Sequence, residues 1–197
     1  MADGAVMRGQ RTREALCRAA VELVSESGWG NVSTRLVAER AGVPAGTVHY
    51  HFPSLTDLLI DATTPLLWRA VDEAVAALDT AGDVSAGLEW FAAAVSQYSA
   101  DPAALRLPSE VFLAATRHER LGRQIAAMLA RFRASIAEWL VRCGRGEDAA
   151  GAATVLAATL DGLALHRAVD AAVDPQALTG VLDRLVTPAS KQGSRVP

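Results

Sequence analysis

STRLVAERAGVPAGTVHYHFPSLTDLL, residues 33–59, predicts two short helices separated by a tight turn. Ser33 is placed to cap the first helix, because a serine side chain accepts a hydrogen bond from the free backbone N–H groups of the first turn. The helix continues to about Arg40. Gly42 ends it, since glycine adopts the left-handed conformation of a C-terminal turn without steric cost.

The second short helix lies between two prolines. Pro44 suits a first helical turn, whereas Pro53 ends the segment, because the residue before a proline avoids the helical conformation. Two short helices joined in this way are typical of the helix-turn-helix motif, whose second helix enters the major groove of DNA. We predict this motif over residues 33–52. Many helical hairpins that bind no DNA share the same pattern.

The rest of the chain is predicted to be helical as well, because apolar residues recur at helical spacing almost throughout. A first helix over roughly residues 9–27 precedes the motif. Longer helices are expected at about residues 55–80, 84–99, 103–116, 118–143, 147–170 and 175–187. The fold class is therefore all-α. We expect a DNA-binding domain at residues 9–55, a second domain at 56–187 and a disordered tail at 188–197.

Composition favours an intracellular protein. Cys17 and Cys143 lie far apart and match no metal or redox spacing. The N-terminus has no apolar segment of the kind found in secretory signals. The uncharged run 149–160 is shorter than the roughly 18 apolar residues of a membrane span. We expect a cytoplasmic protein, bound at the nucleoid when on DNA, with no membrane partner.

The net charge of −3 argues at first against a nucleic-acid partner, but the charges are unevenly distributed. Four arginines fall within residues 8–18, opposed there only by Glu14. A local basic arm can contact phosphates even on an acidic protein. A solvated helix face is the alternative that charge alone leaves open.

Residues 33–59 closely resemble the signature of the tetracycline-repressor (TetR) family, which typically reads Thr-x-Arg-x-Ile-Ala-x-x-Ala-Gly-Val-Ser-x-Gly-Thr-Leu-Tyr-x-His-Phe-x-Ser-Lys-x-x-Leu. The match runs in register without a gap, and the similarity extends over roughly residues 10–60. The resemblance implies a dimeric transcriptional regulator, most often a repressor that a small molecule releases from a palindromic operator, an inverted repeat. It also implies that a ligand-binding and dimerisation domain of roughly six helices follows the DNA-binding domain.

The family's DNA-contacting positions fall on a defined set of residues here. They are Thr34, Arg35, Ala45, Gly46, Thr47, His49, Tyr50 and His51, supported by Arg8 and Arg11. Arg35 is the best candidate for base readout, because a guanidinium can bond guanine O6 and N7 together. An ion pair with Glu39, four residues on, is its alternative role. His51 can be either a packed ring or a phosphate donor.

Two positions depart from the family pattern. His49 replaces the usual tyrosine, and a protonated imidazole would bind phosphate more strongly, so DNA affinity is predicted to depend on pH near about 6.5. Leu55 replaces the usual lysine and cannot donate a hydrogen bond. One phosphate contact per subunit is therefore in doubt, although the N-terminus of the following helix can still offer N–H groups to phosphate.

The second domain is predicted to hold the dimer interface and a ligand pocket. The resemblance implies a four-helix bundle between subunits, for which we select Ala152, Leu156, Leu160, Leu163, Leu178 and Leu182. An intramolecular core is the alternative. Aromatic side chains and one histidine are the candidates for lining an apolar pocket: Trp68, Trp90, Phe91, Phe112, Phe132 and His166. These rings are also what an ordinary core contains.

The competing functions are an activator or ligand-independent regulator and, less favoured, an all-α enzyme. No spacing typical of a catalytic triad, phosphate loop or metal site accompanies the four histidines. We therefore expect no cofactor and no metal, and a small, largely apolar effector.

Overall fold

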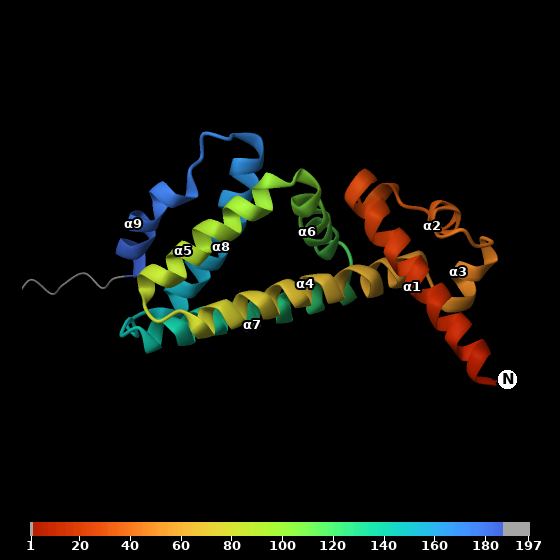
Figure 1. Cartoon of the computed structure of the whole chain (residues 1–197), viewed down its shortest axis with the longest axis horizontal. Helices are drawn as coiled ribbons and strands as arrows, with labels where there is room; N and C mark the ends of the chain where they lie inside the picture. Colours follow the sequence, from red (N-terminus) through yellow and green to blue (C-terminus); the bar gives the residue numbers. More distant parts are fainter. Residues whose placement is uncertain (1, 187–197) are drawn as a thin grey trace, which may run out of the picture. The chain divides into compact units, whose positions relative to one another are not determined.

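The computed structural model describes residues 2–186, and its regular secondary structure within that range is entirely helical (Figure 1). The elements are α1 (Ala2–Ser27), the short 3-10 helix η1 (Trp29–Asn31), α2 (Thr34–Ala41), α3 (Gly46–His51), α4 (Leu55–Thr80), α5 (Val84–Ala100), α6 (Pro102–Ala115), α7 (Glu119–Arg142), α8 (Ala149–Val169) and α9 (Pro175–Val186). The prediction of an all-α fold is confirmed. The predicted tail at 188–197 lies outside the described residues.

Helix boundaries differ from the predicted ones mainly in the DNA-binding part. The helix predicted to start at Pro44 starts at Gly46. The preceding residues form a turn in which the Thr47 N–H donates to the Pro44 carbonyl at 2.9 Å. This three-residue spacing is the tighter winding that often opens a helix. Helix α3 is therefore only six residues long.

The chain divides into two compact units, each made of two stretches of sequence. The first unit comprises residues 1–72 and 101–128, and the second comprises residues 73–100 and 129–197. Helix α6 belongs to the first unit because it packs on α1. The Glu110 carboxylate of α6 also accepts the Trp29 N–H at 2.8 Å.

The core of the first unit holds the helix-turn-helix against α1 and α4. Leu16, Ala20 and Val24 form the buried stripe of α1. Against them pack buried side chains from α2, α3, the turn after α3 and α4: Val37, Ala38, Val48, Phe52, Leu58 and Leu59. Each buried side chain of the size of leucine or valine contributes about 1.5–3 kcal/mol. The position of the six-residue α3 is thus fixed by packing rather than by its own helical stability.

The second unit is built around α5. Helices α8 and α9 pack on it (Figure 1). Trp139 of α7 is completely buried, and its indole lies where Gly87 of α5 has no side chain. A Cβ at position 87 would stand 2.0 Å from the Trp139 ring. Glycine is therefore required at this close approach.

Helix α8 is apolar on more than one side. Within the described residues it alone is long and apolar enough to span a membrane by length and composition, yet only 28% of its most apolar window is buried. Its inner face packs on α5 and α9. Its outer face exposes Val155, Leu165 and Val169. Such an exposed apolar helix face is typical of an interaction surface.

Candidate DNA-binding surface and effector pocket

The turn between α2 and α3 has the geometry that the sequence predicts. The Ser33 hydroxyl accepts the Leu36 N–H at 3.3 Å and caps α2. Gly42 has φ 68° and ψ 33°, the left-handed conformation. The Val43 N–H then donates to the Ala38 carbonyl at 3.0 Å. These bonds satisfy backbone groups at both ends of α2 and fix the direction in which the chain enters α3.

Packing divides the helix-turn-helix into an inner and an outer face. Val48 and Phe52 are buried. The Tyr50 side chain, by contrast, is 85% exposed. Most of the predicted DNA-contacting residues share the outer surface: Arg35, Ala45, Gly46 and His49 are exposed, while Thr34, Thr47 and His51 are half-buried. An exposed set of hydroxyl, imidazole and guanidinium groups on a two-helix hairpin is what contact with a DNA groove requires.

Arg35 and Arg40 lie on the same short helix but have different surroundings. Arg40 bonds Glu26 at 2.7 Å and Glu22 at 3.3 Å, both on α1. Arg35 forms no ion pair with Glu39 or with any other residue in the described part of the chain. The alternative role considered for Arg35 is thus not formed, and its guanidinium is exposed.

The arginines of the basic arm on α1 also differ in their surroundings. Arg8 and Arg11 are exposed. Arg13 is instead directed inward: its Nη1 donates to the His51 carbonyl at 2.9 Å, and its guanidinium lies 4.0 Å from the centre of the Phe52 ring. The His51 ring contacts Tyr50 edge-on at 5.0 Å. His51 is half-buried, and its backbone carbonyl holds Arg13.

Leu55, which replaces the family's usual lysine, packs against the core of the first unit. Ser54 caps α4 by accepting the Asp57 N–H at 3.0 Å, and its hydroxyl donates to the Asp57 carboxylate at 2.7 Å. The positive charge near this helix start comes from α7. Arg120 bonds Asp57 at 2.5 Å and Asp61 at 2.7 Å, and its hydrogen bond to Asp61 is the main cause that raises the pKa of the guanidinium.

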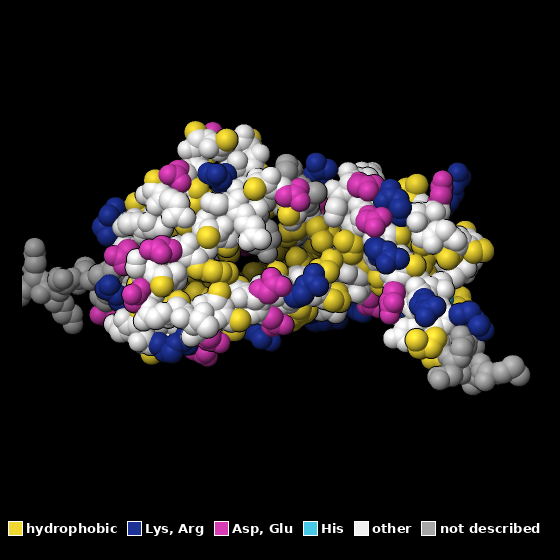
Figure 2. All heavy atoms as spheres, viewed as in Figure 1, with side chains coloured by type: hydrophobic (Ala, Val, Ile, Leu, Met, Phe, Trp, Pro, Cys, Tyr) yellow, Lys and Arg dark blue, Asp and Glu magenta, His cyan; other side chains and the backbone are white. Residues whose placement is uncertain are grey.

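On the face shown in Figure 2, basic and acidic side chains are interspersed. A broad basic field, of the kind that binds DNA without regard to sequence, is not present on this face.

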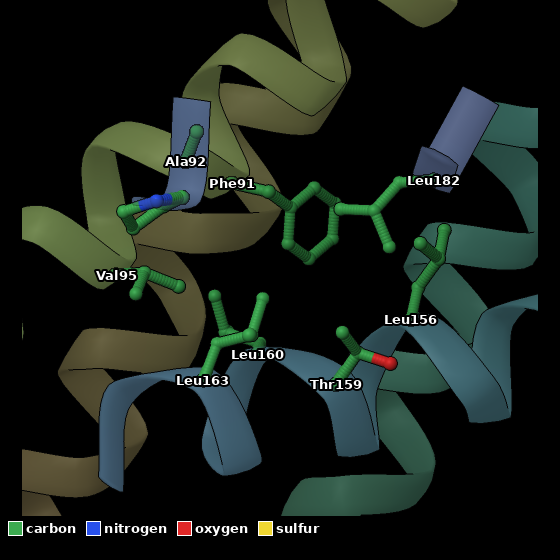
Figure 3. Close-up of a pocket in the computed structure, with 9 residues that line it drawn as sticks. Phe91, Ala92, Val95, Leu156, Thr159, Leu160, Leu163 and Leu182 are labelled. Atoms are coloured by element: carbon green, nitrogen blue, oxygen red, sulfur yellow. The ribbon is translucent and has the colours of Figure 1, made fainter. Parts of the chain in front are cut away.

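An apolar hollow between α5, α8 and α9 is a candidate pocket in the second unit. It is lined by Phe91, Ala92, Val95, Leu156, Thr159, Leu160, Leu163, Pro175 and Leu182. Figure 3 shows the Phe91 ring extending toward Leu182, with Thr159 and Leu160 beside them. The free space is about that of a single water molecule. A larger ligand would have to separate these helices.

Of the six predicted pocket residues, Phe91 alone lines this hollow. Phe132 and Trp90 contact the Phe91 ring from other sides, with ring centres 6.4 and 5.2 Å away. Trp68 and Phe112 belong to the first unit. His166 is exposed on α8. Most of the six predicted residues therefore lie outside this hollow.

The lining that sequence reasoning missed comes from α8. Leu156, Leu160 and Leu163 were assigned to the dimer interface, as was Leu182 of α9, but all four line the hollow. Leu156 and Leu182 are buried within the single chain. Ala152 and Leu178 are half-buried. This stripe faces α5, so it is not the outer surface of α8.

One polar group near the hollow lacks a partner. The Nε1–H group of Trp139 is buried and has no hydrogen-bond acceptor among the described residues. The Trp139 ring lies 6.3 Å from the Phe91 ring. A buried donor without an acceptor costs about 1–3 kcal/mol, so such groups in native proteins call for an explanation.

Two protein families match this chain, one in its N-terminal part and one in its C-terminal part. Residues 16–62 match the family described as bacterial regulatory proteins, tetR family. Residues 79–188 match the family described as tetracyclin repressor-like, C-terminal domain. Together these two matches include the helix-turn-helix and all the helices that form the hollow.

Individual proteins are similar over most of their length. The HTH-type transcriptional regulator BetI of Agrobacterium fabrum is 31% identical over 166 residues, which are 81% of this chain and 78% of that protein. A transcriptional regulator of Streptomyces coelicolor has a TM-score of 0.72 at 30% identity and covers 90% of this chain and 99% of its own. A regulator of Saccharomonospora viridis, solved in complex with choline, has a TM-score of 0.71 at 23% identity, covering 88% and 94%. The last likeness concerns the fold alone.

Proposed function

Because this chain belongs to the tetracycline-repressor (TetR) family of transcriptional regulators, we propose that it is a homodimeric repressor of a palindromic operator, released when a small molecule enters the hollow. The observation that carries the proposal is the exposed outer face of α2 and α3, with Arg35 unpaired among the described residues and Tyr50 open to solvent. We propose that Arg35, Thr47 and Tyr50 contact bases, and that Arg8, Arg11 and His49 contact phosphates. The protein would act in the cytoplasm on the nucleoid.

The test is selection of DNA by the purified protein. Wild-type protein, incubated with a pool of random-sequence duplexes, is expected to enrich an inverted repeat whose half-sites lie about one helical turn, roughly 34 Å, or a multiple apart. Footprinting on the DNA flanking the gene should then protect the same sequence. Enrichment of no sequence at all would contradict operator binding. A reporter gene that rises rather than falls when the protein is present would identify an activator.

We infer that the homodimer forms through the outer face of α8 and α9 rather than through the stripe predicted from the sequence. This face contains Val155, Gly162 and Leu165 of α8 and Val181 and Leu185 of α9, which are exposed or half-buried in the single chain. The burial of only 28% of the most apolar window of α8 supports this assignment, because an extended apolar helix face is normally covered by another chain.

Replacing Leu165 by glutamate is expected to convert the dimer into a monomer. The charge would be buried against its own symmetry mate, since a two-fold interface brings the same surface of both chains together. Sedimentation or light scattering at micromolar concentration measures the mass. Leu113→Glu is the matched control, because Leu113 on α6 is 51% exposed and Leu165 is 48% exposed. A dimeric mass for the Leu165→Glu variant would rule out this face.

The same interface predicts a dependence of dimerisation on pH. Asp161 lies one turn before Leu165 on α8, and although the residue is open to solvent on one side of the single chain, desolvation raises the pKa of its carboxyl to about 6. A raised pKa means that the folded chain favours the protonated form, so stability present at low pH is lost as pH rises from about 4 through 6. In the dimer this carboxyl would be buried further, which raises its pKa again, so its protonation favours association. Dimerisation should therefore be tighter at pH 5 than at pH 8, and Asp161→Asn should remove most of the difference. His166 and Arg184 remain in both proteins, so the comparison isolates the carboxyl.

The effector is proposed to be small and largely apolar, with one hydrogen-bond acceptor. The lining of the hollow is apolar except for Thr159. The partnerless Trp139 Nε1–H group supports an acceptor on the ligand. A ligand that binds the opened hollow shifts the protein toward that state only by its difference in affinity for the two states. DNA release would follow if the opened state presents the two recognition helices at a spacing that B-DNA does not match.

A further inference from the structure

Four charged side chains form a continuous chain of hydrogen bonds between α7 and the recognition helix. Asp57 and Asp61 lie one turn apart on α4, and Arg120 in the first turn of α7 bonds both of them. The second oxygen of Asp61 accepts from Arg13 of α1 at 2.8 Å. Arg13 in turn donates to the carbonyl of His51, the last residue of α3.

The charges of these four hydrogen-bonded side chains balance one another. Two carboxylates one turn apart on a helix repel each other, and two guanidinium groups compensate them. Arg120 contacts one oxygen of each carboxylate, while Asp61 is shared between two arginines from different helices. Each pair is partly exposed and would contribute little by itself. Shared partners make such groups act together, so the loss of one changes the geometry of the next.

The last hydrogen bond of this series, from Arg13 to the His51 carbonyl, is made at the C-terminal end of α3. The carbonyl groups of the last helical turn have no partner within the helix and carry the negative end of the helix dipole. Arg13 supplies a cation there, and its guanidinium also covers the Phe52 ring that anchors α3 in the core. Since α3 has only six residues, its orientation depends on such external contacts.

We propose that Arg120 and Arg13 are positioning residues for operator recognition, which link the first turn of α7 to α3 through Asp61. Neither residue contacts a base in this arrangement. These four side chains and the His51 carbonyl form an ion-pair relay from α7 to α3 within the first unit. The inference rests on the proposed role of α3 in DNA binding.

The test compares Arg120→Ala with Arg123→Ala. Arg123 lies on the same helix and pairs only with Glu119, on the solvent-exposed surface, so both variants lose one positive charge. The probe is the duplex that wild-type protein selects from the random-sequence pool. Arg120→Ala is expected to lower affinity for this duplex by about five- to twentyfold, whereas Arg123→Ala should change it less than twofold. On a random-sequence duplex the two variants should behave alike, because the net charge is the same.

A second measurement separates positioning from general instability and needs no DNA. Amide hydrogen exchange of full-length Arg120→Ala protein should be faster in residues 46–52 and unchanged in the buried stripe of α1. Arg120→Lys keeps the charge but cannot hold both carboxylates with a planar guanidinium, so its hydrogen exchange in residues 46–52 should lie between those of the wild type and Arg120→Ala. In an Arg13→Ala background, Arg120→Ala should cause no further loss of affinity, because the relay is already interrupted.

Two results would overturn the proposal: equal operator affinity in Arg120→Ala and Arg123→Ala, or an Arg120→Ala effect that is the same size with and without Arg13. Failure of the proposed function looks different. In that case the wild-type protein would not prefer the selected duplex over a random one, while the exchange comparison in α3 would still show whether the relay positions that helix.

Discussion

Arg35→Ala protein is expected to bind its operator about 30-fold or more weakly than the wild type. A bidentate contact between arginine and guanine contributes about 1–3 kcal/mol of discrimination. A dimer makes this contact twice, so the binding free energy that depends on it is about 2–6 kcal/mol. The structure leaves the guanidinium available for this contact, because within residues 2–186 it forms no ion pair. Titration of labelled operator duplex at fixed salt measures the change.

Arg40→Ala is the matched control for this prediction. It removes the same charge from the same helix, but Arg40 is bonded to Glu22 and Glu26 of α1. Affinity for random-sequence DNA should fall by a similar, small factor in both variants, since that binding reports charge alone. Equal losses of operator affinity in the two variants would remove Arg35 from the base-reading set.

Gly87→Ala protein is expected to be less stable than the wild type by about 1–3 kcal/mol, the usual cost of extra volume in a packed core. The added Cβ would lie 2.0 Å from Cζ2 of Trp139 and 2.6 Å from Cε2, which is far inside van der Waals contact. The ring is completely buried and has little freedom to move. Urea unfolding followed by circular dichroism gives the free energy of unfolding.

The control is Gly151→Ala in the first turn of α8. No atom lies within 4 Å of a Cβ built there. Alanine is favoured over glycine in helices by about 0.8–1 kcal/mol, so this variant should be as stable as the wild type or slightly more so. An unchanged midpoint for Gly87→Ala would mean that Trp139 and α5 can separate at little cost, and the close approach would not be a structural requirement.

The sequence was most informative where local rules determine the structure. The roles of Ser33 and Gly42 depend on backbone geometry within a few residues, and both were predicted. The burial of Val48 and Phe52 follows from helical spacing within one short segment. The outer face of α3 is what remains once these two anchors are placed.

The orientation of α8 was not accessible to the same reasoning. Leu156, Leu160 and Leu163 form a clear apolar stripe, but so do Val155 and Leu165 on the opposite side. When a helix is apolar on both sides, the spacing of its residues identifies two faces that can be buried. It does not show which partner each face contacts. The choice depends on α5 and α9, which pack on the first stripe.

Long-range polar contacts were also beyond prediction. The sequence does not indicate the partners of Arg13, Glu110 or His118. In the structure Glu110 accepts the Trp29 N–H and His118 lies 5.9 Å from the Trp29 ring. The partners of Arg120 are 59 and 63 residues away in sequence. Charge at one position says nothing about a partner that only the fold brings near.

If the effector enters the hollow as proposed, the closed state of the hollow affects the effector concentration at which the protein responds. Because the space between α5, α8 and α9 is about the size of one water molecule, the state that accepts a ligand is a minor one before the ligand arrives. The measured dissociation constant is then the intrinsic one divided by the fraction of open protein, so the response threshold is set by opening as much as by contacts. Trimming the side chain that fills the hollow, Phe91, should therefore lower the effector concentration needed for a response, even though the ligand loses a contact.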